Sequence, residues 1–369
     1  MHNETWLYRI ALTKIDKIGS AKAKNLISYC GSAEAVFKEK KSKLLKIPYI
    51  GELLAQSLTN TNVLHEAEKE LEFIAKNQIR CFYYLDEHYP YRLKHIPDSP
   101  LILYYKGNAD LNQNRMIAVV GTRRMSEYGQ EILSSFIKNL KLYQVSIVSG
   151  LAYGVDAAAH RQCLIEEMET IGVLAHGLDL IYPPENKKLA VQMLERGGLL
   201  TEFPIKTKPD RERFPMRNRI VAGLTDATVV IETMVEGGSV ITADLAMGYN
   251  RDVFAFPGRI NDVMSAGTNA LIKNQKAQLI ESAADLAYQM KWDLEDQQVK
   301  PIQPSLFLEL EENEKSLVDI IQQHPEVHVD VFYKNLSHTP SELASLLLGL
   351  EFKGVIRCLP GKRYSLTLR

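Results

Sequence analysis

Arginines surround one phenylalanine in residues 209–223, which read PDRERFPMRNRIVAG. The aromatic residue is Phe214, and the arginines near it are Arg211, Arg213, Arg217 and Arg219. A guanidinium group can hold a phosphate through two parallel N–H donors, and an aromatic ring can stack on a nucleobase. The two residue types together therefore favour a ligand with both phosphates and exposed bases, such as an unpaired nucleic-acid strand.

This cluster stands out because the chain as a whole is nearly neutral. Lysine and arginine number 44 against 45 aspartates and glutamates, for a formal net charge of −1. A local excess of arginine in such a chain makes a local positive field, which attracts phosphates. An alternative for each arginine is solvation or an ion pair with a nearby carboxylate, for which Asp210, Glu212 and Glu202 are the candidates.

Three further segments offer backbone donors to the same kind of ligand. In each, glycine and other small residues precede a helical pattern: IAVVGTRRMSEYG from Ile117, VSGLAYGVDAAAH from Val148 and EGGSVITADLA from Glu236. Backbone N–H groups at such a helix start can bind an anion, and Arg123 beside the first turn favours a phosphate there. Several such turns along one edge of a sheet suit a chain of phosphates better than one nucleotide.

Composition limits the class of protein. A chain of 369 residues predicts two or three domains, and 46% apolar with 24% charged residues is typical of a globular protein. Four scattered cysteines, Cys30, Cys81, Cys163 and Cys358, indicate neither a zinc site nor a disulfide framework. We expect no metal or other cofactor, no export signal, no membrane span and a cytoplasmic location.

The central region has the pattern of an α/β fold. Short apolar runs begin at Ile117, Val145, Thr170, Ala227 and Asp252, and amphipathic stretches such as 127–142 and 240–249 lie between them. Continuous apolar runs are typical of parallel strands that are buried on both faces. We therefore expect a Rossmann-like, doubly wound, mostly parallel sheet over residues 76–290, with ligands beyond the carboxyl ends of its strands.

The regions on either side have different patterns. Residues 1–75 predict an all-α, SAM-like domain, because IDKIGSAKAKNLI and IPYIGELLAQSLT resemble tandem helix-hairpin-helix motifs. This domain either contacts nucleic acid or only packs and positions. Residues 291–308 predict a linker, and residues 309–369 a winged helix with helices at 316–323, 331–335 and 340–353, the last of which begins after Thr339. The last helix is poor in cations, so it favours protein contact or a regulatory lid at least as much as duplex DNA.

Several segments together resemble a known family. The strings VVGTRRMSEYG, VSGLAYGVDAAAH, GLDLIYPPEN, FPMRNRIVAGL and FAFPG are similar in order and spacing to those of the DNA-processing protein A family, also called Smf. The resemblance covers roughly residues 89–280. It implies a non-enzymatic protein that binds single-stranded DNA, forms a homodimer through its Rossmann-like domain and helps to load RecA during natural transformation.

The resemblance also implies roles for individual residues. Arg123 and Arg211 are expected to contact phosphates and Phe214 a base, whereas Asn218 is expected to fix a turn or a helix start. Arg217 and Arg219 are two residues apart on a presumed helix, so they cannot both face one ligand. The candidate single-stranded DNA-binding residues are Gly121, Thr122, Arg123, Arg124, Ser149, Gly150, Arg211, Phe214, Arg217, Asn218, Arg219, Gly238 and Ser239.

Two other functions remain open from the sequence. A nucleotide phosphoribohydrolase would use Glu232 or Glu236 as its carboxylate, with Asp156 and His160 as an acid–base pair. Against this, Asp156 near a helix start is stabilised by the helix dipole, and His160 is expected to bond to that aspartate. The other alternative is a regulator that binds duplex DNA through the winged helix.

Overall fold

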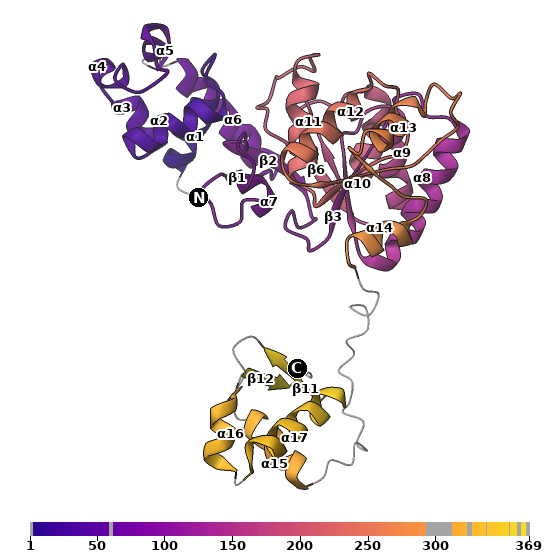
Figure 1. The fold of residues 1–369 in the computed structure, drawn as a ribbon. Coiled ribbons are helices and arrows are strands. Elements are labelled where there is room, and N and C mark those ends of the chain that lie inside the picture. Colours follow the sequence, from indigo (N-terminus) through magenta and orange to yellow (C-terminus); the bar gives the residue numbers. More distant parts are fainter. Residues whose placement is uncertain are drawn as a thin grey trace. The chain divides into compact units, whose positions relative to one another are not determined.

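The structure is a computed structural model of the 369-residue chain. It describes residues 3–58, 62–292, 312–322, 327–336, 338–353, 355–359 and 363–366 (Figure 1). The chain divides into two compact units, Met1–Leu294 and Glu295–Arg369. Except for its first two residues, the expected linker over 291–308 lies outside the described residues.

The first unit is built on one large sheet. Its nine strands have the order β1-β2-β6-β5-β4-β3-β7-β8-β9. Their bounds are β1 Arg80–Tyr83, β2 Ile102–Gly107, β3 Met116–Val120, β4 Ser146–Ser149, β5 Thr170–Val173, β6 Gly197–Thr201, β7 Ala227–Val230, β8 Asp252–Ala255 and β9 Gln278–Leu279. In this spatial order, all strands from β6 through β5, β4, β3, β7 and β8 to β9 pair in parallel. Strands β1 and β2 are antiparallel additions at one edge. The mostly parallel, doubly wound sheet is therefore confirmed.

The order of the strands reverses at β3. The chain first runs outward from β3 through β4 and β5 to β6, and it then returns to place β7 on the other side of β3. In open α/β sheets, such a reversal leaves a crevice at the carboxyl ends of the strands, where ligands bind.

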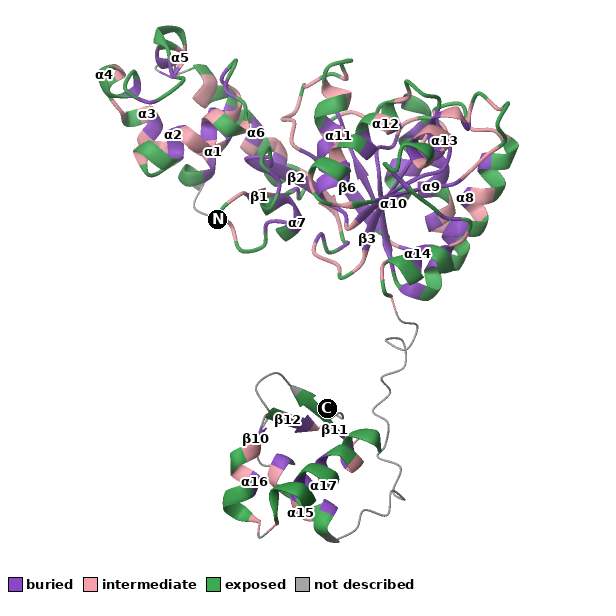
Figure 2. Ribbon diagram, in the orientation of Figure 1, coloured by how far each residue is buried: buried purple, intermediate pink, exposed green. Residues whose placement is uncertain are grey.

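Helices cover both faces of this sheet. Ile117 and Val119 of β3 share a core with α8 (Glu127–Leu140), α9 (Val155–Ile165) and α14 (Ala283–Gln289). Ala118 and Val120 belong instead to the core that contains α11 (Arg213–Gly223), α12 (Gly238–Gly248) and α13 (Ala266–Lys273). Because alternate residues of one strand enter different cores, both faces are buried, as Figure 2 shows for the central strands. Two shorter helices are α7 (Tyr91–Lys94) and α10 (Lys187–Met193).

Strand β6 is the element of the central sheet that the sequence did not suggest. It begins with two glycines, a residue type that is depleted in strands. Gly197 has a φ of +152°, and a Cβ there would lie 1.9 Å from the carbonyl oxygen of Thr170 on β5. A residue without a side chain is therefore required where β6 enters the sheet beside β5.

The amino-terminal helices pack onto the β1–β2 edge. They are α1 Asn3–Thr13, α2 Ser20–Cys30, α3 Ala33–Lys38, α4 Lys41–Leu44, α5 Glu52–Ser57 and α6 Asn62–Lys76. Their core includes Leu101, which directly precedes β2, and Ile102 and Tyr104 of β2. The Nζ of Lys24 on α2 also donates to the carbonyl oxygen of Ser99 at 2.7 Å. Through these contacts the first helical hairpin, residues 15–27, packs against the sheet.

The second unit is small and has its own core. Its described elements are α15 Glu312–Gln322, β10 Val327–His328, α16 Val329–Asn335, α17 Pro340–Phe352, β11 Ile356–Leu359 and β12 Arg363–Leu366. The three strands form an antiparallel sheet in the order β10-β12-β11. Thr339 and Glu342 form a capping box at the start of α17, as the sequence predicted. Three helices followed by a β-hairpin are the arrangement expected of a winged helix.

Candidate nucleic-acid interface

An arginine and two aromatic rings meet at the carboxyl ends of the parallel strands. Arg123 follows β3, and Phe214 lies in the first turn of α11. The guanidinium carbon of Arg123 is 5.1 Å from the centroid of the Phe214 ring. The Tyr182 ring also contacts Phe214, with the two ring centroids 6.2 Å apart and an interplanar angle of 46°. A cation and two rings in contact can hold one phosphate and stack on bases.

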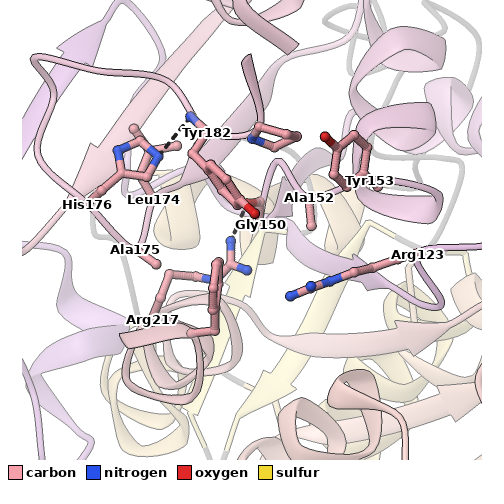
Figure 3. Close-up of a pocket in the computed structure, with 11 residues that line it drawn as sticks. Arg123, Gly150, Ala152, Tyr153, Leu174, Ala175, His176, Tyr182 and Arg217 are labelled. Carbon is pink, nitrogen blue, oxygen red and sulfur yellow. Dashed lines mark hydrogen bonds between the residues drawn. The ribbon is translucent and has the colours of Figure 1, made fainter. Parts of the chain in front are cut away.

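These residues belong to one pocket (Figure 3). It is lined by Arg123, Gly150, Ala152, Tyr153, Leu174, Ala175, His176, Tyr182, Pro183, Phe214 and Arg217. Tyr153 and Tyr182 are 41% and 40% exposed, so both rings are accessible at its mouth. The sequence reasoning missed both tyrosines. The signal was their place after strand ends, in VSGLAYG and GLDLIYPPEN.

His176 positions Tyr182 in this pocket. Its Nδ1 lies 2.9 Å from the carbonyl oxygen of Gly177, and its Nε2 accepts the backbone N–H of Tyr182 at 3.2 Å. Since Nε2 acts as an acceptor, Nδ1 carries the proton and the ring is neutral. Burial lowers the pKa of His176, which is consistent with this neutral form.

Arg217 ties two strand ends together beneath the pocket. Its side chain is buried, and its Nη1 donates to the carbonyl oxygens of Gly150 after β4 and, at 2.7 Å, Val173 of β5. Its Nε donates to Oδ1 of Asn218 at 3.1 Å. Asp156 offsets part of the cost of burying this charge. The geometry favours a structural role for Arg217, and its contact with DNA stays a prediction.

The turn after β4 uses several of its polar groups internally. A Cβ at Gly150 would lie 2.0 Å from Nη1 of Arg217, so glycine is needed for the guanidinium to approach. The Gly150 N–H donates to Oδ2 of Asp156 at 3.2 Å, and the Ser149 hydroxyl donates to the carbonyl oxygen of Val119 at 2.7 Å. These two donors already have partners within the protein, which favours a structural role for them. Ligand contacts by Ser149 and Gly150 stay predictions.

The turn after β3 leaves its two arginine side chains exposed. The Thr122 N–H donates to the carbonyl oxygen of Glu232 at 2.7 Å, and the Thr122 hydroxyl oxygen accepts the Arg124 N–H at 3.1 Å. A Cβ at Gly121 would lie 2.5 Å from Val155, which explains the glycine. Among the described residues, neither the Arg123 nor the Arg124 guanidinium has an ion pair or hydrogen-bond partner. Both can therefore reach a ligand.

The remaining predicted residues lie along α11 and at the start of α12. Arg219 is buried, forms an ion pair with Glu202 and donates to the carbonyl oxygen of Asp98, so the ion-pair interpretation is correct for this arginine. The Nδ2 of Asn218 donates to the carbonyl oxygen of Gly238 at 3.4 Å, at the first residue of α12.

Three more predicted contacts differ in their access to a ligand. Arg211 is exposed, just before α11, and it is not part of the pocket lining. Gly238 is exposed as well, whereas Ser239 is 5% exposed. The structure therefore brings Arg123 and Phe214 together, and it leaves Arg211 on the nearby surface.

Glu232, Asp156 and His160, the candidates of the enzymatic alternative, bond to different partners. Glu232 is fully buried, and its carboxylate accepts the Ser126 N–H at 2.9 Å and the Ser126 hydroxyl at 2.5 Å, so it holds the start of α8. The expected bond between His160 and Asp156 is wrong. The Nδ1 of His160 lies 2.6 Å from the hydroxyl oxygen of Thr170 on the neighbouring strand β5.

The His160 environment predicts a measurable dependence of stability on pH. Burial lowers its pKa from 6.5 to about 3, so the folded protein keeps the ring neutral where the unfolded chain takes up a proton. The free energy of unfolding therefore keeps the full contribution of the neutral His160 above pH 6.5. It loses that contribution as the pH falls toward 3, because only the unfolded chain takes up the proton. Between pH 6 and pH 4, urea denaturation should show the wild type losing roughly 1 kcal/mol per pH unit more than His160→Gln.

The exposed His65 provides the control for this measurement. Its side chain is 62% exposed, and His65→Gln should leave the slope of stability against pH unchanged. Parallel curves for wild type and His160→Gln would show that the buried ring takes up a proton without unfolding.

Two features are absent from the described part of the chain. Within it, no three histidine, cysteine, aspartate or glutamate side chains are placed to share a metal ion. None of the helices described there is both long and apolar enough to cross a membrane.

Comparison with known proteins identifies the family. Residues 80–291 match the family described as DNA recombination-mediator protein A, and residues 10–61 match the SAM-like helix-hairpin-helix tandem. The chain belongs to the DNA recombination-mediator protein A family. Protein Smf from Synechocystis is 34% identical over 282 residues, which cover 74% of this chain and 70% of that protein. DNA processing protein DprA from Streptococcus pneumoniae is 42% identical over 205 residues, or 56% and 72% of the two chains.

Two solved structures of family members are similar to this one. The X-ray structure of DNA processing protein A from Streptococcus pneumoniae has a TM-score of 0.63 at 33% identity, over 77% of this chain and 97% of that chain. The Helicobacter pylori protein, whose structure describes a single-stranded DNA binding mode, has a TM-score of 0.53 at 30% identity, over 58% and 96%. The resemblance noted in the sequence motifs is thus confirmed.

Proposed function

We propose that this chain binds single-stranded DNA along the carboxyl ends of its parallel strands. The observation that carries the proposal is the contact of Arg123 with the Phe214 ring, at 5.1 Å, in a pocket that also contains Tyr182. Aromatic rings bind any base through its face, and arginines follow the phosphates, so this combination suits a strand of any sequence. The binding mode described for the Helicobacter pylori relative supports the proposal.

The residues take different roles in this proposal. The exposed guanidinium groups of Arg123, Arg124 and Arg211 contact phosphates, and Phe214 and Tyr182 stack on bases. We call the path along the carboxyl ends of β3, β4, β5 and β7 the groove. The turns that border it are shaped by the other predicted contacts, Gly121, Thr122, Ser149, Gly150, Asn218, Gly238 and Ser239. Arg217 and Arg219 hold the groove walls in place, because both are buried and bonded within the protein.

Binding without catalysis is the form of the function that we propose. Glu232 holds the start of α8, Asp156 accepts backbone N–H groups, and His160 bonds to Thr170. Each buried group thus has a separate structural partner. This distribution supports a binding protein over a hydrolase, which would need its acid and base at one accessible place.

Family membership supports finer proposals as well. The chain forms a homodimer through its Rossmann-like domain and helps to load RecA onto incoming single strands during natural transformation, in the cytoplasm. We also propose the domain division suggested by the sequence, with a helical domain over 1–75, the DNA-binding domain over 76–290, a linker over 291–308 and a winged helix over 309–369.

Salt dependence tests the phosphate contacts. Fluorescence anisotropy with a labelled single strand should show the logarithm of the binding constant falling linearly with the logarithm of salt concentration. Each phosphate neutralised contributes about −0.7 to the slope, so Arg123→Ala and Arg211→Ala should each reduce its magnitude by about 0.7.

Arg196 provides a matched control for this titration. It directly precedes β6, at the amino-terminal ends of the parallel strands, and its side chain is 50% exposed beside Glu167. Arg196→Ala should leave the slope unchanged. A wild-type slope in both Arg123→Ala and Arg211→Ala would place the phosphates elsewhere on the protein.

A further inference from the structure

A second cavity lies beside α11, where the amino-terminal helices meet the sheet. Its volume is about 470 Å³, and its lining residues come from the first helical hairpin, the segment before β2, the segment after β6, and α11. Pockets of about 300 to 1,000 Å³ are the usual size for small organic ligands. The cavity is therefore large enough for one nucleobase with part of its sugar.

Helix α11 separates this cavity from the pocket that contains Phe214. Phe214 and Arg217 line the first pocket, whereas Met216 and Arg219 line the second cavity. With 3.6 residues per turn, Phe214 and Met216 point about 200° apart around the helix axis. Met216 is 46% exposed, so the second cavity reaches the surface beside the amino-terminal half of α11.

The two sites also follow each other along the edge of the sheet. The first pocket uses residues 174–176, directly after β5. The second cavity uses residues 202–204, directly after β6, and β6 is the neighbour of β5 in the sheet. A single strand of DNA bound along the carboxyl ends of the β-strands therefore meets the two sites in succession.

The walls of the second cavity favour a base over a phosphate. Ile18, Leu101, Ile102, Phe203 and Met216 supply apolar surface. The one arginine in the lining, Arg219, already forms an ion pair with Glu202 and donates to Asp98, so its charge is neutralised. Lys22 of α2 also lines the cavity, and its Nζ donates to the carbonyl oxygen of Lys17 at 3.2 Å. A phosphate would therefore lack an unpaired cation at the α11 wall, whereas the flat faces of a base match apolar surface.

Glu202 adds a preference for a ligand with N–H groups. Its side chain is 10% exposed, and it lines the cavity. Its Oε2 binds Arg219, but its Oε1 is buried and has no hydrogen-bond partner in the described part of the chain. A buried acceptor without a partner is costly, and a donor from a ligand would relieve that cost.

We propose that this cavity receives one nucleobase of the single strand whose neighbouring bases stack at Phe214. The inference rests on the proposed function, and it assigns the first helical hairpin a part in DNA binding. The base enters between Ala21 on α2 and Met216 on α11, and its N–H edge faces Glu202. The cavity then adds a second base contact at the end of β6.

Filling the cavity tests the proposal in the full chain. Ala21 is exposed and lines the cavity, so Ala21→Trp fills the opening without disturbing the core. Met216→Trp fills it from the opposite wall. Ser28→Trp is the matched control, because Ser28 is exposed on the same helix but does not line the cavity. Thermal unfolding verifies that each variant is folded, and the DNA probes are short single strands with 2-aminopurine at one position at a time.

The outcomes separate the proposal from its alternatives. We expect both filling variants to bind at least about fivefold more weakly, the loss that corresponds to one stacked base, and Ser28→Trp to bind as the wild type does. Ala21→Trp and Met216→Trp should also abolish the fluorescence change at one 2-aminopurine position and keep the change that depends on Phe214. Wild-type affinity with an unchanged fluorescence profile would overturn the proposal, as would an equal loss at every position. If the wild type binds no single strand, the proposed function itself fails.

Discussion

Phe214→Ala should weaken the binding of single-stranded DNA by about 5- to 150-fold. Base stacking on one aromatic residue contributes about 1 to 3 kcal/mol, and each 1.4 kcal/mol is tenfold in affinity. The ring carries no charge, so the salt slope should stay near that of the wild type while the whole line shifts to weaker binding. Phe214→Tyr should keep most of the affinity. Anisotropy titrations at several salt concentrations measure both quantities.

An exposed aromatic residue outside the pocket controls for general loss of ring surface. Tyr288 on α14 is 81% exposed, and Tyr288→Ala should bind as the wild type does. If Phe214→Ala changed the slope but not the affinity at high salt, the ring would be acting through phosphate contacts and not by stacking.

The contact between Arg123 and Phe214 predicts that their effects are not additive. With the guanidinium carbon 5.1 Å from the ring centroid, removal of either group changes the position of the other. Residues in contact usually show interaction energies of about 0.5 to 3 kcal/mol in double-mutant cycles. A coupling of this size would support one binding site that contains both groups.

The strands of the central sheet were predictable because their pattern is local. The apolar runs at Ile117, Val145, Thr170, Ala227 and Asp252 became β3, β4, β5, β7 and β8. Strand β6 was missed since Gly197 and Gly198 resemble turn residues, and only the contact with Thr170 explains them. Glycine that is needed for a close approach between strands leaves no local signal of a strand.

The candidate site was predictable in part. Residue type and motif pointed to Arg123 and Phe214, and the strand order explains why they meet. The burial of Arg217 was not predictable, because it depends on carbonyl groups at the ends of two other strands. The partner of His160 was missed for the same reason. Asp156 is four residues away on the helix, but the actual partner, Thr170, lies on a different element.

Arg217→Leu should destabilise the fold by about 2 to 6 kcal/mol, because each of two buried acceptors left without a donor costs about 1 to 3 kcal/mol. The substitution leaves the carbonyl oxygens of Gly150 and Val173 without their donor, and it removes the positive charge that offsets the buried Asp156. Gly150→Ala should cause a related loss, because its Cβ would displace the same guanidinium group. Urea denaturation measures both variants.

Arg124→Leu serves as the matched control for stability alone, because Arg124 is itself a proposed phosphate contact. Arg124 is exposed, and surface substitutions usually change stability by less than about 0.5 kcal/mol. The comparison also decides what Arg217 does. A stable Arg217→Leu protein with strongly reduced DNA affinity would make this arginine a direct ligand contact. Loss of stability, with DNA affinity retained by the molecules that remain folded, would instead show that Arg217 supports the groove by joining the ends of β4 and β5. The exposed Arg123 and the half-buried Phe214 would then make the contacts.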